Sequence, residues 1–266
     1  MTKLPKRKPD THKGDYGRVL VVAGSPGMCG AAALAALGAH RAGAGLVYVA
    51  CPEQVVDILS IKLTCEVIRP FPRQKAVEKI LEHAADCDVA VIGPGLSREA
   101  YVVDALRELV PSLGIPFVLD ADGLNAFEGQ TDLLARGQAP RVLTPHPGEA
   151  ARLLGRPIED RKAAAVELAK RLMAVVVLKG HRTVIADGTR AAVNKTGNPG
   201  MATGGTGDVL AGVIGALIGQ GMSPFDAAVY GAHVHGRAGD LAKRKVGEVS
   251  LMATDLLDAL PGAFRS

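Results

Sequence analysis

The sequence predicts an α/β protein whose central sheet is mainly parallel and flanked by helices on both faces. Short apolar runs rich in β-branched residues alternate with longer stretches of helical pattern, the order expected of strands joined by crossover helices. The runs are continuously apolar, as in strands that are covered on both faces. No Pro/Ser-rich linker or internal repeat divides the chain, so we expect residues 1–266 to form a single domain.

The expected elements follow one another in the order that this fold class requires. Parallel strands are predicted at 18–24, 46–51, 88–93, 116–121, 141–144 and 174–180. Helical patterns are present at 30–45, 74–85, 98–112 and 159–173. The pattern then changes, because Asp187 and Gly188 lie between two short strands within 182–194 and indicate an antiparallel hairpin. Two further helices are expected at about 206–220 and 223–243.

Composition excludes several classes of function. Aromatic residues make up 3% of the chain and Trp is absent, which argues against a surface that stacks nucleic-acid bases. Part of the formal charge of +4 comes from Lys3, Lys6, Arg7 and Lys8, which we interpret as a solvated terminus rather than a nucleic-acid arm. We find no signal peptide and no apolar run of membrane-spanning length. We therefore expect neither a nucleic-acid partner nor a membrane.

The four cysteines, Cys29, Cys51, Cys65 and Cys87, are irregularly spaced and form no CxxC or Cys/His cluster. Each lies in or beside an apolar stretch. We expect buried free thiols in a reducing compartment, and hence a cytoplasmic protein.

The segment TGGTGD at 203–208 has the properties of a phosphate-binding loop. Glycines let an anion approach the backbone amides closely, and the following helix contributes unpaired N–H groups and the positive end of its dipole. The Walker pattern is absent, and GSPGMCG at 24–30 does not match the dinucleotide fingerprint. Inside the expected helix, Gly212 and Gly215 indicate close packing against a neighbour, since each costs about 1 kcal/mol relative to Ala.

Asp208 begins this helix and has two possible roles. An isolated aspartate here would be an N-terminal cap or first-turn acid. Beside a bound phosphate it would be a general base that removes the proton of a substrate hydroxyl. We favour the base, and we expect the helix dipole to keep its carboxylate ionised.

The ordered set of motifs resembles one known family over nearly the whole chain. A GxGD loop opening a late helix is typical of the ribokinase-like superfamily. The motifs that narrow the match are HKGDYGRVLVVAGS (12–25), GAAALAALGAHRAGAGLV (30–47), VIGPGL (91–96), LDADGLNA (119–126), LTPHPGEAARLLG (143–155), VVLKGHRTVI (177–185) and NKTGNPGMATGGTGDVLAG (194–212). Together they resemble the NAD(P)H-hydrate dehydratases, which implies a ribokinase-like fold.

The resemblance also implies a reaction. Members of this family repair NADH and NADPH that carry a hydroxyl on the reduced nicotinamide ring. A nucleotide, ADP in typical bacterial members and ATP in eukaryotic ones, phosphorylates the hydroxyl of the S-epimer, and phosphate then leaves. We therefore expect an ADP-dependent hydro-lyase that restores NADH or NADPH and releases AMP and phosphate. Magnesium should be held mainly by phosphates and water.

Individual roles are implied where residues match the family's motifs. The positions that contact the hydrate correspond to Ala31, Gly95, His146 and Asp208. The positions that bind ADP or AMP correspond to Lys179, Gly180, His181, Arg182, Thr183, Gly205, Thr206 and Gly207. Glu149 corresponds to the magnesium and phosphate network, with an indirect metal contact.

Structural roles remain open for several of these residues. His146 lies between two prolines and fits a purely structural histidine, Glu149 fits a first-turn helix acid, and Lys179 fits a surface strand end. DADGLNA supplies Asp120, Asp122 and Asn125 after a strand, and its paired acids would bind metal or cap a helix. Ser97 stands where many relatives carry Gly.

The family further implies a homotetramer and cooperation with an epimerase that interconverts the two epimers of the hydrate. No space for that module precedes His12, so we expect the epimerase to be a separate polypeptide. Two other functions fit the same residues. One is a kinase of a small hydroxymethyl vitamin precursor, and the other is a nucleotide sensor without catalysis. TPHPGE in place of an Asn-containing motif argues against the kinase, and Asp208 argues against the sensor.

Overall fold

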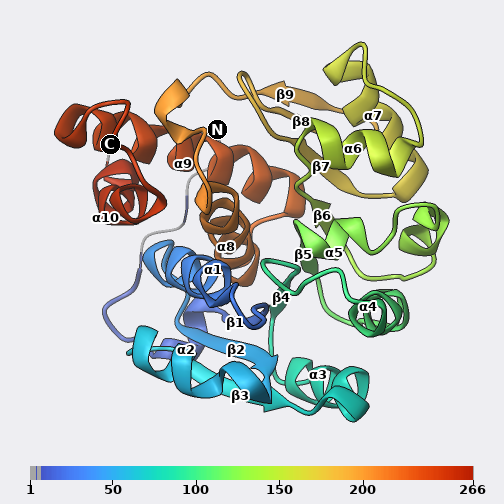
Figure 1. The fold of residues 1–266 in the computed structure, drawn as a ribbon. Coiled ribbons are helices and arrows are strands. Elements are labelled where there is room, and N and C mark those ends of the chain that lie inside the picture. The colour runs from blue at the N-terminus through green and yellow to red at the C-terminus, as the bar shows by residue number, and fades with distance from the viewer. Residues whose placement is uncertain (1–3, 5–6, 266) are drawn as a thin grey trace.

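The central sheet contains nine strands in the order β3-β2-β1-β4-β5-β6-β7-β8-β9 (Figure 1), in a computed structural model that describes residues 4 and 7–265. The strands are β1 (Arg18–Val22), β2 (Leu46–Pro52), β3 (Val67–Phe71), β4 (Val89–Ile92), β5 (Phe117–Leu119), β6 (Arg141–Leu143), β7 (Val175–Leu178), β8 (Val184–Ala186) and β9 (Ala191–Val193). All pairings from β3 to β7 are parallel, and β8 and β9 add an antiparallel edge. The predicted α/β class with a mainly parallel sheet is confirmed.

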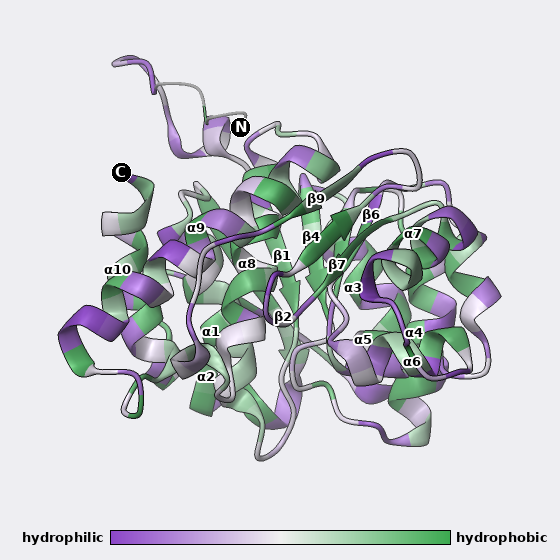
Figure 2. Cartoon of the chain, turned by 90° about the horizontal axis from the view of Figure 1, so that it is seen from above, coloured by the Kyte–Doolittle hydropathy of each residue, from purple (hydrophilic) through white to green (hydrophobic). Residues whose placement is uncertain are grey.

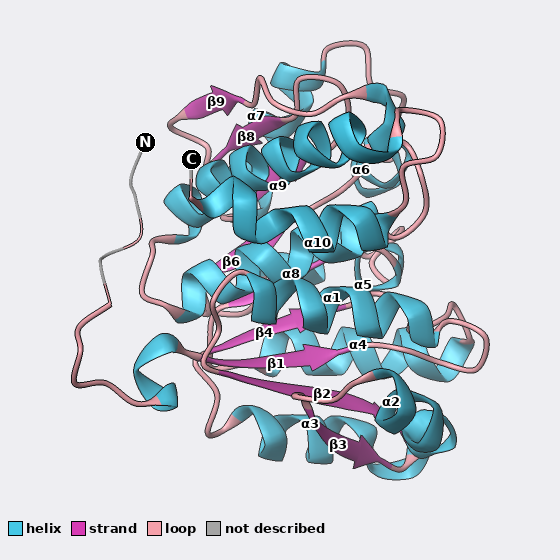
Figure 3. Ribbon diagram, turned by 90° about the vertical axis from the view of Figure 1, so that its left-hand side faces the viewer, coloured by secondary structure: helices cyan, strands magenta, loops and turns pink. Residues whose placement is uncertain are grey.

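Helices cover both faces of this sheet. They are α1 (Cys29–Arg41), α2 (Val56–Lys62), α3 (Ala76–Ala84), α4 (Ala100–Ser112), α5 (Asp122–Asn125), α6 (Pro147–Leu154), α7 (Arg161–Leu172), α8 (Thr206–Gly219), α9 (Pro224–Val246) and α10 (Ala253–Phe264). Helices α1, α2, α8, α9 and α10 pack on one face and α3, α4, α6 and α7 on the other. Figure 3 looks at the first of these faces, with α1, α8 and α10 in front of the strands.

Alternate residues of each central strand enter the two cores. Val19 and Val21 of β1 pack beneath α1 and α8, whereas Leu20 and Val22 face the helices on the other side. This two-sided burial explains why the strands are continuously apolar, and they form the green centre of Figure 2. Strands β4 to β8 are buried throughout.

The two edges of the sheet differ from the centre. The predicted hairpin is β8–β9, and the side chain of Asp187 closes its turn by accepting from the amides of Thr189 (3.1 Å) and Arg190 (2.7 Å). Strand β3 is not predicted by the sequence. Arg69 and Pro70 interrupt its apolar run, which an edge strand tolerates because one side needs no hydrogen-bond partner.

The helices α2, α5, α6 and α10 also lie outside the helical ranges predicted from the sequence. The cysteine prediction is wrong at one position: all four thiols are free, but Cys65 is exposed while Cys29, Cys51 and Cys87 are buried. In the basic N-terminal segment, Arg7 donates to the carbonyl of Gly43 (2.7 Å), and Lys3 and Lys6 lie outside the described residues.

Candidate functional site

The residues that the sequence singles out lie near the carboxyl ends of the parallel strands. Strands β1, β4, β5, β6 and β7 are parallel, so their carboxyl ends lie on the same side of the sheet. The strand order reverses between β1 and β4, so the loops that follow these two strands form the topological switch point of the sheet. Ligands of open α/β sheets bind at such switch points.

Ala31 and Gly95 lie together at this switch point. Ala31 is in the first turn of α1, and Gly95 is in the loop after β4. A Cβ atom added to Gly95 would lie 3.0 Å from the Cβ of Ala31 and 2.8 Å from the carbonyl oxygen of Met28. The two positions are therefore neighbours, and only glycine allows the loops to approach so closely.

Ser97 ends the same loop in a left-handed conformation with φ +79°. This is a conformation that glycine adopts without strain, which explains why glycine suits the position. The amide of Ser97 donates to Asp122 Oδ2 (3.0 Å), and this bond ties the loop to α5.

A buried ion cluster follows β5, β6 and β7. The Nζ atom of Lys179 lies 2.7 Å from Asp120 Oδ1 and 3.8 Å from Glu149 Oε2. The side chain of Asp120 is 1% exposed and that of Glu149 is 5% exposed. Asp120 therefore acts neither as a helix cap nor as a free surface acid, and Lys179 is not a surface strand end.

Charge balance in the cluster explains the protonation of its members. Burial acts to lower the pKa of Lys179, but the carboxylates of Asp120 and Glu149 raise it, and the net shift is upward. Burial raises the pKa of Glu149, with the ammonium of Lys179 opposing this shift and Asp120 adding to it. Lys179 thus carries its charge at neutral pH.

His146 caps α6 and also faces the site. Its Nδ1 accepts from the amides of Gly148 (3.0 Å) and Glu149 (3.3 Å), and its own amide donates to Glu149 Oε2 (2.7 Å). Since Nδ1 is an acceptor, the neutral ring carries its proton on Nε2. The side chain is half exposed and its Nε2 lies 3.4 Å from Glu149 Oε1, so the capping role through Nδ1 is compatible with a contact of Nε2–H to Glu149 or to a ligand.

Asp208 lies in the first turn of α8, next to this cluster. Burial raises its pKa to about 7, and the carboxylates of Asp120, Asp122 and Glu149 add to the shift while Lys179 opposes it. The expectation that the helix dipole keeps Asp208 fully ionised is therefore wrong. Desolvation and like charges outweigh the dipole, and the group titrates near neutral pH as a general base requires.

The glycine loop leaves the start of α8 open. Gly205 has φ +90°, and no side chain caps the helix. A Cβ atom on Gly207 would lie 3.3 Å from Lys179 Nζ and 3.8 Å from Asp120 Oδ2. The amino end of α8 therefore faces the lysine of the cluster directly, an arrangement that suits an anion with a second positive group behind it.

The segment from Lys179 to Thr183 joins the end of β7 to the hairpin. Thr183 turns its hydroxyl inward, toward the carbonyl of Gly180 (3.0 Å), and His181 and Arg182 are exposed. Arg161 holds the segment from α7: its guanidinium donates to the carbonyls of Leu178 (2.9 Å), Lys179 (2.9 Å) and His181 (2.5 Å).

Arg161 was not singled out from the sequence, because it reads as one more charged residue on a polar helix. Asn125, the amide of the DADGLNA motif, accepts from Arg152 (2.8 Å). In the part of the chain that the structure describes, no three His, Cys, Asp or Glu side chains are grouped as a metal-ion site requires.

Comparison with known proteins places this geometry in a family. The family model for NAD(P)H-hydrate dehydratase matches residues 19–262. This chain belongs to that family. Its fold is ribokinase-like: it superposes with a TM-score of 0.87 on a ribokinase-like superfamily protein from Enterococcus faecalis, which is 28% identical, over 98% of this chain and 91% of the other.

Two more relatives are informative. The ADP/ATP-dependent NAD(P)H-hydrate dehydratase from Bacillus subtilis, co-crystallised with ATP/Mg2+, is 33% identical with a TM-score of 0.84 and 99% and 94% of the two chains covered. The bifunctional NAD(P)H-hydrate repair enzyme Nnr of Moorella thermoacetica is 49% identical over 278 residues, which cover 100% of this chain and 52% of the relative. The chain thus spans about half the length of such curated relatives.

Among residues 4 and 7–265, no helix combines the length and the apolar character needed to cross a bilayer.

Proposed function

We propose that this chain catalyses the nucleotide-dependent dehydration of the S-epimers of NADH hydrate and NADPH hydrate, with ADP as the preferred nucleotide and ATP as a second substrate. The observation that carries the proposal is the position of Asp208, a partly buried carboxylate with a pKa of about 7 at the open amino end of α8. Membership of the NAD(P)H-hydrate dehydratase family supports the choice of substrate.

In the first step, Asp208 takes the proton of the ring hydroxyl as that oxygen attacks the terminal phosphorus of ADP. A new P–O bond forms, the bond from phosphorus to the bridging oxygen breaks, and AMP leaves. The amides of Gly205, Thr206 and Gly207 receive the phosphoryl group, and Lys179 stabilises its charge from behind. Since the proton acceptor has a pKa near neutral, it is ionised in a large share of molecules and still basic enough to take the proton.

In the second step, phosphate leaves the ring carbon in place of hydroxide, which is a far poorer leaving group. The lone pair of the adjacent ring nitrogen expels it, and a proton then leaves the neighbouring ring carbon to form the double bond of the reduced nicotinamide. We assign the ring to a position beside Ala31 and Gly95, with Nε2–H of His146 donating to it. The adenosine part of ADP is assigned to the segment Lys179, Gly180, His181, Arg182 and Thr183.

The residues fit magnesium held through phosphates. Asp120, Asp122, Glu149 and Asp208 bring more negative charge together than Lys179 balances, and this excess contributes to the raised pKa of Asp208. A divalent cation relieves such an excess. Glu149 would contact it through water, and magnesium would neutralise the phosphates of the nucleotide.

Several wider assignments rest on the family rather than on the site. We propose a single domain over residues 1–266, which the continuous nine-stranded sheet of the described residues supports. We propose a cytoplasmic homotetramer whose substrate pool is supplied by an epimerase of the same hydrates. The four free thiols support the compartment.

The assay that tests the function combines the purified protein with NADH hydrate, magnesium and either ADP or ATP. The ultraviolet absorption band of reduced nicotinamide should return, with one AMP and one phosphate released per NADH when ADP is used. No recovery with either nucleotide would refute the dehydratase. Accumulation of a stable phosphorylated product from a hydroxymethyl vitamin precursor would instead favour the kinase, which His146 argues against because such kinases usually carry Asn there.

A further inference from the structure

The segment that leads into the glycine loop, and the first residue of α8 behind it, are tied to one helix, α9. The side-chain amide of Asn194 donates to the carbonyl of Ala232 (3.1 Å), and the hydroxyl of Thr196 donates to the carbonyl of His233 (2.9 Å). These bonds hold the segment that leads from β9 into the loop. The segment therefore runs against α9 rather than free in solvent.

Asp240 continues this contact two turns further along α9. Its two carboxylate oxygens accept from the amide of Gly197 (3.0 Å) and from the side-chain amide of Asn198 (3.1 Å). This close approach requires residues without side chains on the contacting surface of α9. A Cβ atom on Gly236 would lie 2.2 Å from Thr196 Oγ1, and one on Gly239 would lie 2.2 Å from Met201 Sδ.

Among these contacts with α9, the one made by His235 is the nearest in sequence to Asp208. It is 8% exposed, and its Nε2 lies 2.8 Å from the carbonyl oxygen of Thr206, the first residue of α8. A carbonyl accepts only, so the ring carries its proton on Nε2 and donates. Burial lowers the pKa of His235 to about 4, so the ring is neutral at physiological pH and the donor does not change with ordinary pH.

Thr206 stands between Gly205 and Gly207, two residues before Asp208. Its hydroxyl is also engaged, within 3.0 Å of the carbonyl of Met201 and 3.1 Å of that of Thr203. Glycine neighbours do not hold a peptide unit in place by themselves, because they lack side chains that pack. The orientation of the first peptide of α8, and with it the amides offered to phosphate, therefore depends on partners from outside the loop.

We infer that His235 and Asp240 are positioning residues for the proposed reaction, holding the glycine loop and the first turn of α8 in the geometry that binds the nucleotide phosphates and aims Asp208. The inference rests on the proposed function, because it assigns a task to residues that touch neither substrate. It adds α9 to the phosphate site, to which the sequence assigned only the loop and α8.

Binding of ADP in the presence of magnesium, measured by titration calorimetry on the full chain, tests the inference without relying on turnover. His235→Leu removes the donor at similar volume, and we expect the Kd for ADP to rise about 10-fold, the factor that corresponds to one buried hydrogen bond. His235→Gln places an amide donor near the position of Nε2 and should bind within about threefold of the wild type.

His83→Leu is the matched control. His83 Nε2 also contacts a backbone carbonyl, that of Pro70 (3.3 Å), but it lies on α3, which packs on the other face of the sheet. This variant should bind ADP like the wild type. For Asp240, Asp240→Ala should weaken ADP binding about 3- to 10-fold and speed amide hydrogen exchange in 194–206, whereas Asp258→Ala, on the exposed side of α10, should do neither.

Equal ADP affinity in wild type, His235→Leu and Asp240→Ala would overturn the inference, and so would a His235→Gln variant as weak as His235→Leu. If His235→Leu does not fold, the comparison of Asp240→Ala with Asp258→Ala decides alone, since Asp240 is only partly buried. Wild-type protein that binds ADP but fails to restore NADH would refute the proposed function, while these affinity ratios would still decide the role of α9.

Discussion

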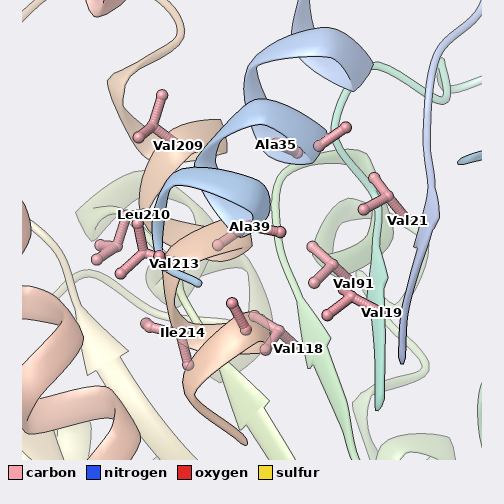
Figure 4. Close-up of a cluster of buried hydrophobic side chains, with 14 of the residues drawn as sticks. Val19, Val21, Ala35, Ala39, Val91, Val118, Val209, Leu210, Val213 and Ile214 are labelled. Carbon is pink, nitrogen blue, oxygen red and sulfur yellow. The ribbon is translucent and has the colours of Figure 1, made fainter. Parts of the chain in front are cut away.

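The helices on the two faces of the sheet pack through side chains of different size. The fully buried phenylalanines Phe117 and Phe127 and most of the fully buried leucines, such as Leu168, lie on the face of α3, α4, α6 and α7. The opposite face is filled mainly by Ala, Gly and Val, and Figure 4 shows α1 and α8 meeting over the valines of β1 and β4.

This difference in side-chain size determines which face can relax around a substitution. A Cβ atom on Gly212 of α8 would lie 2.0 Å from the carbonyl oxygen of Ala35, and one on Gly38 of α1 would lie 2.7 Å from that of Val209. Backbone cannot move aside by changing a rotamer, whereas leucine side chains can. The α1–α8 face thus sets the position of Asp208 by rigid contact, and the other face supplies stability together with the loops that carry Asp120 and His146.

Truncation of a large side chain on the α7 face should have the largest effect on stability. Leu168→Ala is expected to lower the free energy of unfolding by about 2–5 kcal/mol, because it leaves a cavity in a fully buried cluster. The kcat of the folded enzyme should stay within about threefold. Urea denaturation and initial rates measure the two effects, and a kcat that drops more than tenfold would break the proposed division between the faces.

Removal of the base on the α8 face should have the opposite profile. Asp208→Asn should lower turnover by at least about 10²-fold while the protein stays folded and still binds ADP. Asp258→Asn, an exposed acid on α10, is the matched control and should keep its rate. An Asp208→Asn enzyme that turns over NADH hydrate near the wild-type rate would remove the base role.

A single methyl group placed between α1 and α8 should affect both properties. Gly212→Ala is expected to destabilise the fold by about 1–3 kcal/mol, although Ala is the better helix former by about 1 kcal/mol, and to lower kcat as α8 shifts. Gly30→Ala in α1 meets nothing within 4 Å and should stabilise by up to about 1 kcal/mol. Thermal unfolding of the two variants compares them, and equal behaviour would contradict rigid packing at Gly212.

The pH dependence should identify the same carboxylate. With a pKa of about 7, Asp208 loses its basic form on acidification, so kcat/KM should fall about tenfold per unit below pH 7. The effect on stability has the opposite sign. The folded chain holds this proton more tightly than the unfolded chain, so its contribution to stability is present below about pH 4 and is lost as the pH rises through 7.

Asp208→Asn should abolish this loss of stability at high pH. Comparing urea denaturation of the two proteins at pH 5 and pH 8 measures it, and the variant should gain relative to the wild type at the higher pH. A kcat/KM profile that is flat between pH 5 and 8 would show that another group carries the proton.

Much of this molecule can be predicted from local sequence. Continuous β-branched runs predict the central strands because burial on both faces demands apolar residues at every position. TGGTGD predicts an anion-binding helix start because glycine and a helix terminus have that property wherever they occur. Strand β3 is not predicted, because an edge strand does not need a continuous apolar run and tolerates Arg69 and Pro70.

What the sequence by itself determined is therefore the set of elements and the one loop whose chemistry is local. The tertiary structure alone decided the electrostatics and the support of the site. Lys179 meets Asp120 across 59 residues of chain and His235 meets Thr206 across 29. The pKa of Asp208 depends on burial and on three carboxylates from other loops. Desolvation and Coulomb interactions act through space, so they exist only once the strands have brought their ends together.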